Sequence, residues 1–130
     1  MSARILVVED EPEVLKLIAR YLRDAGYKVF TALNGENGLR LARELLPDLI
    51  ILDVILPDLE GFSVCETLRQ RSPTAHIPIL MLTGLAGEIP RCHAFECGVN
   101  EFIRKPFRVP DLLEHVKRTL APHAAQTESP

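Results

Sequence analysis

The chain has 130 residues, of which 47% are hydrophobic and 25% are charged, with 15 basic and 18 acidic side chains. This is a common length for one domain, which can bury a core without disulfides or a structural metal. The net charge of −3 gives no overall basic field, which argues against direct nucleic-acid binding. No apolar run is as long as a membrane span or a signal-peptide core.

The cysteine pattern favours a reducing compartment. Cys65, Cys92 and Cys97 are odd in number and form no CxxC pair, whereas structural disulfides belong mainly to oxidising compartments. We therefore expect a soluble, cytoplasmic protein that does not associate with membranes.

Short apolar runs alternate with helical periodicity in the first half of the chain. Ile5–Val8 predicts a strand, and apolar positions with a 3.6-residue period predict a helix over Pro12–Ala25. A second strand is expected over Lys28–Leu33, followed by a helix from about Glu36 to Leu46. Leu49–Leu52 is apolar at every position, which is typical of a strand buried on both faces of a parallel sheet.

The alternation continues in the second half. A helix is expected over Gly61–Gln70 and a buried strand over Ile77–Leu82. The pattern for a helix is weakest over Gly84–Cys97, where two further breakers delay its start. Glu101–Arg104 predicts a short strand, and Val109–Leu120 predicts an amphipathic helix.

Five strands that alternate with five helices predict an α/β fold. Such alternation favours right-handed βαβ units and one parallel sheet with helices on both faces. A single domain is expected over residues 4–121. Residues 122–130 include two prolines and no large apolar side chain, and are expected to form a disordered tail or the start of a linker.

Polar side chains follow four of the predicted strands. Glu9-Asp10, Asp53, Thr83 and Lys105-Pro106 each stand at such a strand end. The carboxyl ends of parallel strands line one crevice, so these side chains should converge. Each group alone has an ordinary explanation, such as a solvated helix start or a turn, but the four in this order favour a site.

Converging carboxylates need a counterion. Two of them about 4 Å apart repel by roughly 4 kcal/mol at an effective dielectric constant near 20. A cluster of hard oxygen ligands suits Mg²⁺. Lys105 and Thr83 would add an ammonium and a hydroxyl, which together could hold a phosphoryl group on a carboxylate.

The sequence resembles the receiver domain of bacterial response regulators, the signalling proteins of two-component systems, over residues 4–121. This family implies a flavodoxin-like, doubly wound (βα)5 fold with a five-stranded parallel sheet in the order 2-1-3-4-5. The stretches that carry the resemblance are Ile5–Glu11, Leu52–Pro57 with Gly61, Leu82–Gly84 and Phe102–Phe107.

The resemblance implies a role for each acidic position. Asp53 is similar to the phosphoacceptor, which takes a phosphoryl group from a sensor histidine kinase, a phosphotransfer protein or a small phosphodonor. Asp10 and Asp53 correspond to direct Mg²⁺ ligands, with the backbone carbonyl of Ile55 as a third ligand and Glu9 acting through water. The protein would not be an enzyme beyond catalysing its own phosphorylation and dephosphorylation.

The resemblance also implies a switch. Lys105 would pair with the phosphoryl oxygens, and its bond to Pro106 is expected to be cis, a minority form of about 5% of such bonds. Thr83 would move toward the phosphoryl group and Phe102 would turn inward. The surface of the fourth helix, fifth strand and fifth helix would change and control an unknown output partner or domain.

Some positions depart from the family pattern. Leu56 replaces a common methionine, a change that conserves volume. Ile55 and Leu85, which correspond to positions that tune phosphoryl lifetime, are both apolar. We hypothesise that they impede attacking water and lengthen the phosphorylated state.

Three other classes of protein fit this pattern less well. A haloacid-dehalogenase-type phosphatase needs a second aspartate where Ile55 stands, and Glu9-Asp10-Glu11 would repel the phosphate of a flavin. A receiver that serves only as an interaction domain normally lacks one of the acids or the lysine, and all are present here.

A phosphorylation-dependent homodimer is a further expectation. The ion-pair positions familiar from winged-helix regulators are only partly retained. Arg91 with Asp111 and Glu96 with Lys117 would fit, whereas Asn100 with Pro122 would not and Glu101 with His115 is weakened. Such surface pairs contribute little individually.

Overall fold

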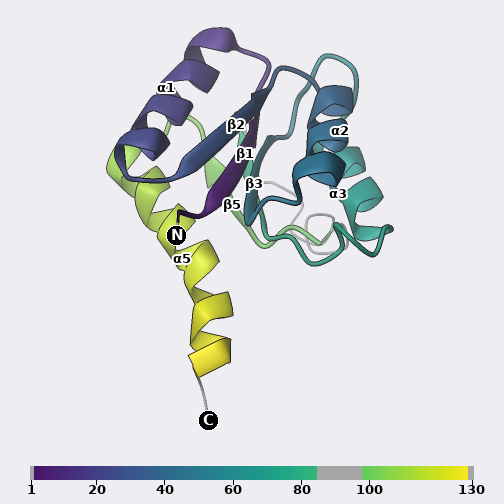
Figure 1. Cartoon of the computed structure of the whole chain (residues 1–130). Helices are drawn as coiled ribbons and strands as arrows, with labels where there is room; N and C mark the ends of the chain where they lie inside the picture. Colours follow the sequence, from purple (N-terminus) through teal and green to yellow (C-terminus); the bar gives the residue numbers. More distant parts are fainter. Residues whose placement is uncertain (1, 85–97, 129–130) are drawn as a thin grey trace.

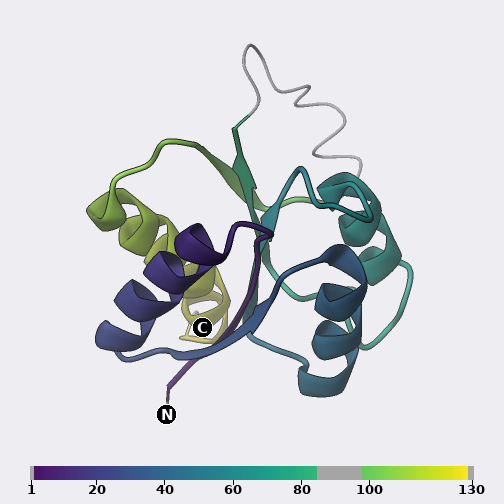
Figure 2. The ribbon, with the colours of Figure 1, turned by 90° about the horizontal axis from the view of Figure 1, so that it is seen from above.

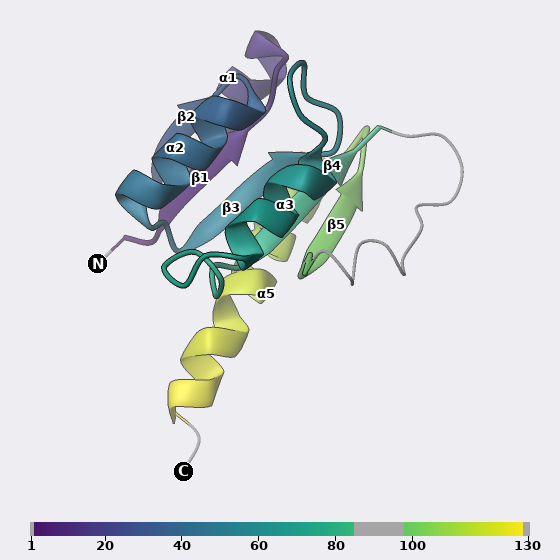
Figure 3. The ribbon, with the colours of Figure 1, turned by 90° about the vertical axis from the view of Figure 1, so that its right-hand side faces the viewer.

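A computed structural model describes residues 2–84 and 98–128 of the chain, with side chains described up to residue 120. One parallel five-stranded sheet organises these residues, with the strands in the order β2-β1-β3-β4-β5. Figure 3 looks onto the face of the sheet that α2 and α3 cover. The expected α/β class and strand order are confirmed. The strands are β1 (Arg4–Val8), β2 (Lys28–Ala32), β3 (Leu49–Asp53), β4 (Ile79–Thr83) and β5 (Glu101–Arg104).

Helices cover both faces of this sheet (Figure 1). Seen from above, α1 and α5 lie on one side and α2 and α3 on the other (Figure 2). The helix expected within Gly84–Cys97 lies outside the described residues, apart from Gly84 itself. The helices described are α1 (Pro12–Asp24), α2 (Gly35–Leu45), α3 (Gly61–Arg69) and α5 (Val109–Glu128).

Alternation along the central strands builds two separate cores. On β1, Leu6 and Val8 belong to a buried cluster with residues of α2 and α3, whereas Ile5 and Val7 belong to one with residues of α1 and α5. This follows from the two-residue period of a strand, which sends successive side chains to opposite faces. The strands β1 and β3 are therefore fixed from both sides, which makes their carboxyl ends a rigid base for a site.

Two expected boundaries differ from the structure by more than one residue. β4 starts at Ile79 rather than at Ile77, because the Ile77 amide donates to the Thr74 carbonyl in a turn, and Pro78 has no amide hydrogen. α5 ends at Glu128 rather than at Leu120, and three alanines after Leu120 favour helix. The helix continues through Glu128, while the disordered tail or linker start expected over residues 122–130 and the domain boundary at residue 121 stay predictions.

Within residues 2–84 and 98–128, no helix is both long enough and apolar enough to cross a bilayer.

Candidate functional site: an acidic cluster with a shared lysine

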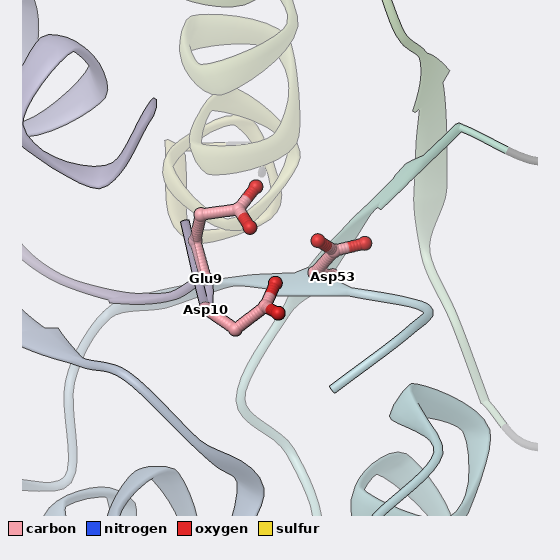
Figure 4. A group of neighbouring side chains, drawn as sticks. All are labelled: Glu9, Asp10 and Asp53. Atoms are coloured by element: carbon pink, nitrogen blue, oxygen red, sulfur yellow. The ribbon is translucent and has the colours of Figure 1, made fainter. Parts of the chain in front are cut away.

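Three carboxylates meet at the carboxyl end of the sheet. Glu9 and Asp10 directly follow β1, and Asp53 is the last residue of the adjacent β3. Each offers an oxygen atom, and these atoms all lie within 4.8 Å of one another (Figure 4). Glu9 is fully buried and Asp53 is only 4% exposed, whereas Asp10 is partly exposed. The cluster therefore has one side open to solvent.

Lys105 reaches this cluster from the loop after β5. Its Nζ donates to Oε1 of Glu9 at 2.5 Å and to Oδ2 of Asp53 at 2.9 Å. The Lys105 amide donates to the Thr83 carbonyl at 2.6 Å, and the Lys105-Pro106 bond is cis, the isomer that the resemblance implies. One ammonium is thus shared between acids from two different strands.

The cluster carries more negative charge than Lys105 can balance. Burial and the neighbouring Asp53 raise the pKa of Glu9 to about 7, although the hydrogen bond from Lys105 works in the opposite direction. Burial lowers the pKa of Lys105, but its bonds to Glu9 and Asp53 outweigh this and raise the pKa overall, so the ammonium is retained. A divalent cation would relieve the remaining repulsion.

The loop after β3 is held close to Asp53. The Ile55 amide donates to Oδ1 of Asp53 at 3.3 Å, and the Gly61 amide donates to the Val54 carbonyl at 2.7 Å. A Cβ atom on Gly61 would lie 2.2 Å from the Asp53 carbonyl oxygen, well inside any ordinary contact. Glycine is therefore required for α3 to begin this close to the acid, while the Ile55 side chain is 59% exposed beside it.

The other expected residues lie around the cluster. Thr83 is buried at the end of β4, the strand next to β3. Phe102 is partly buried in the middle of β5 and packs against the core on the α2 and α3 side. Leu85 lies outside the described residues.

The donor set fits Mg²⁺. Carboxylate and carbonyl oxygens, with room for water on the open side, are the ligands that this hard cation takes, and no soft ligand is among them. The acids Glu9, Asp10 and Asp53 could hold it.

The sequence patterns singled out no role for two residues that shape the site. In the sequence, Gly61 stands out only as part of a motif, although its fixed spacing after Asp53, the acid at the end of the strand, can be read there. Asp58 carried no local signal, because its partners lie 22 and 23 residues away in the sequence.

Comparison with known proteins identifies the fold and the family. The sequence model of the response regulator receiver domain matches residues 5–117. The DNA-binding dual master transcriptional regulator RpaA of Synechocystis is 42% identical over 117 residues, which are 90% of this chain and 48% of that protein. The chain thus spans about half the length of this relative.

Solved structures give the same assignment. The chemotaxis response regulator CheY4 of Vibrio cholerae superposes with a TM-score of 0.87 at 32% identity, covering 92% of this chain and 100% of that one. The receiver domain of the sensor histidine kinase PA1611 from Pseudomonas aeruginosa, solved with a magnesium ion in its active-site cleft, gives 0.85 at 30% identity, covering 93% and 99%. The fold, the strand-end acids and these matches agree: the chain belongs to the response regulator receiver domain family of two-component signalling.

Proposed function

We propose that the chain is a phosphoacceptor switch that receives a phosphoryl group on Asp53 with Mg²⁺ bound. The observation that carries this proposal is the Asp53 carboxylate itself, which lies between the Lys105 ammonium at 2.9 Å and the acidic pair that follows β1. A nucleophile held between a cation and a set of oxygen ligands that suits a divalent metal is what phosphoryl transfer requires.

In the proposed reaction, an oxygen of Asp53 attacks the phosphorus of a phosphohistidine, or of a small phosphodonor. The new P–O bond forms as the bond from phosphorus to the leaving group breaks, and the electron pair of the broken bond goes to the imidazole nitrogen of phosphohistidine or to the leaving oxygen of an acyl phosphate. Lys105 would transfer its hydrogen bonds to the phosphoryl oxygens, and Thr83 would donate its hydroxyl to another. Bound Mg²⁺ supplies charge neutralisation of the phosphoryl oxygens; Asp10, Asp53 and the Ile55 carbonyl are its proposed ligands, with Glu9 acting through water.

The readout is proposed to involve β5, α5 and the helix expected over Gly84–Cys97. Phe102 would turn inward as Thr83 moves, which changes this surface for an output partner or domain. A sensor histidine kinase or a phosphotransfer protein is the proposed donor, and the cysteine usage supports action in the cytoplasm. Beyond this self-modification we propose no catalytic activity.

A phosphorylation-dependent homodimer through the same surface stays a proposal. Arg91 and Glu96 of the expected ion pairs lie outside the described residues. Glu101, at the start of β5, accepts hydrogen bonds within its own chain from Arg118 at 2.7 Å and Thr119 at 3.0 Å. These bonds would compete with a contact from Glu101 to a second copy.

Beryllofluoride, an analogue of the phosphoryl group, tests the proposal. Added with Mg²⁺ to ¹⁵N-labelled protein, it should shift the amide resonances of Asp53, Thr83 and Phe102, and the Asp53→Asn variant should not respond. A wild-type spectrum that does not change, or changes equally in Asp53→Asn, would refute the proposal. Release of inorganic phosphate from phosphate esters by the wild type would instead favour the phosphatase alternative.

A further inference from the structure

The loop between β3 and α3 is attached to a helix distant in sequence. Oδ1 of Asp58 accepts a hydrogen bond from the Gly35 amide at 2.8 Å, and Oδ2 accepts one from the Glu36 amide at 2.9 Å. Both amides belong to the first turn of α2, where no helical carbonyl is available to them. One carboxylate in the loop thus satisfies two free donors of the helix.

The packing around Asp58 is as close as the hydrogen bonds. A Cβ atom on Gly35 would lie 2.9 Å from Cβ of Leu59, the residue after Asp58, so the loop is seated directly on the first turn of α2. The favourable interaction of an anion with a helix N-terminus adds to these bonds. The hydrogen bond from the Glu36 amide is the main cause that lowers the pKa of Asp58, and the carboxylate therefore remains ionised at neutral pH.

The helix is in turn fixed against the strand that carries the other acids. A Cβ atom on Gly38 would lie 2.8 Å from Cγ2 of Val8, so α2 approaches the end of β1 as closely as glycine allows. Val8 directly precedes Glu9. The loop that follows Asp53 and the strand that leads to Glu9-Asp10 therefore both pack against the same helix, α2.

We propose that Asp58 is a positioning residue, which holds the loop after Asp53 on α2 so that the Ile55 backbone carbonyl stays in place as a cation ligand. The proposal rests on the proposed function, because the ligand it positions is part of the Mg²⁺ site. Three sets of hydrogen-bonded contacts then hold the loop in place. They are the bonds of the Asp58 carboxylate to α2, the bond from the Gly61 amide to the Val54 carbonyl, and the isolated β-bridge between Ile55 and Glu60.

The matched control is Asn34, whose side chain caps the same helix through a hydrogen bond to the helix itself. Its Oδ1 accepts from the Asn37 amide at 2.8 Å. Asn34→Ala and Asp58→Ala both remove a side-chain acceptor from the start of α2, so both should lower the midpoint of thermal unfolding. Only Asp58→Ala releases the loop.

Two measurements on the full chain separate the roles. Without metal, amide hydrogen exchange at Ile55 and Gly61 should be faster in Asp58→Ala and unchanged in Asn34→Ala. In titrations with MgCl₂ followed by NMR, Asp58→Ala should raise the Mg²⁺ Kd on the order of 10-fold, the usual scale for supporting residues of metal sites. Asp58→Asn, which keeps one acceptor oxygen, should give a smaller increase, and Asn34→Ala should give the wild-type Kd.

The outcomes that overturn the proposal are distinct. A wild-type Mg²⁺ Kd in Asp58→Ala would contradict it, as would an equal weakening in Asn34→Ala, which would attribute the effect to helix stability. If the wild type binds no Mg²⁺, or Asp53→Asn binds it as tightly, the proposed function fails and the ligand role of the loop falls with it. The metal-free exchange rates still decide in that case whether Asp58 holds the loop.

Discussion

Replacement of Gly61 by alanine should damage the site through the backbone alone. The added methyl group would lie 2.2 Å from the Asp53 carbonyl oxygen and 2.8 Å from Cα of Val54. Both atoms belong to the main chain, so no side chain can rotate away to make room. An ordinary contact of a Cβ atom begins at about 3.4 Å. The start of α3 and the end of β3 must therefore move apart by about 1 Å to accommodate the methyl group.

Overpacking of this kind costs about 1–3 kcal/mol of unfolding free energy. A displacement of about 1 Å at the reacting groups also slows a positioned reaction by on the order of 10²-fold. Since the chain has no tryptophan, urea unfolding should be followed by far-ultraviolet circular dichroism, with phosphorylation by acetyl phosphate measured in parallel.

Gly84→Ala is the matched control for this variant. A Cβ atom there would lie 3.8 Å from Cδ of Lys105, an ordinary contact near the same site. It should leave both the urea midpoint and the phosphorylation rate close to wild type. A Gly61→Ala protein with the wild-type midpoint and rate would refute the packing argument.

Three further predictions test separate parts of the account. Ile55→Asn should shorten the lifetime of the phosphoprotein, because it replaces an exposed apolar neighbour of Asp53 with a group that can hold water; an unchanged or longer acid-quench half-life would reject this. Burial raises the pKa of Glu101, but hydrogen bonds from His115 and Thr119 outweigh it and lower the pKa overall. Its ionised form therefore stabilises the fold above the ordinary pKa of 4.5, and this contribution is lost as the pH falls through the lowered value. Glu101→Gln should therefore cost on the order of 0.5 kcal/mol in urea unfolding at pH 7 and progressively less as the pH falls below 4.5. Burial raises the pKa of Cys65 to about 11, so its alkylation by iodoacetamide in the native protein should be at least about 100-fold slower than in urea, and equal rates would show that α3 opens freely.

The sequence patterns predicted the parts of the fold that depend on local periodicity. β1 and β3 are short apolar runs and α1 keeps a clear 3.6-residue period, so their types and order followed from residues close together in the chain. The end of α5 did not follow, because Pro122 and small polar residues beyond Leu120 suggest a tail while the alanines between them favour helix.

The site also has a part that the sequence predicts and a part that it does not. The positions of Glu9, Asp10, Asp53 and Lys105 at strand ends were sufficient to predict that they meet. The hydrogen bonds from Lys105 to both Glu9 and Asp53 depend on the conformations of side chains that meet across the sheet. Residue spacing in the sequence does not predict these conformations.

Long-range backbone contacts were beyond the sequence patterns altogether. Arg69, at the end of α3, donates to the carbonyls of Ile77 at 2.8 Å and Gly98 at 2.7 Å, which links the segments that precede β4 and β5. The attachment of Asp58 to α2 is of the same kind. Such contacts join residues that share no period, and only the folded chain reveals them.

The most direct test of the central claim is intact-mass spectrometry after incubation with acetyl phosphate. The account predicts a mass increase of one phosphoryl group that requires Mg²⁺, disappears in Asp53→Asn, and maps to the peptide that contains Asp53. The same increase in Asp53→Asn, or none in the wild type with Mg²⁺ present, would contradict the assignment of Asp53 as the phosphoacceptor.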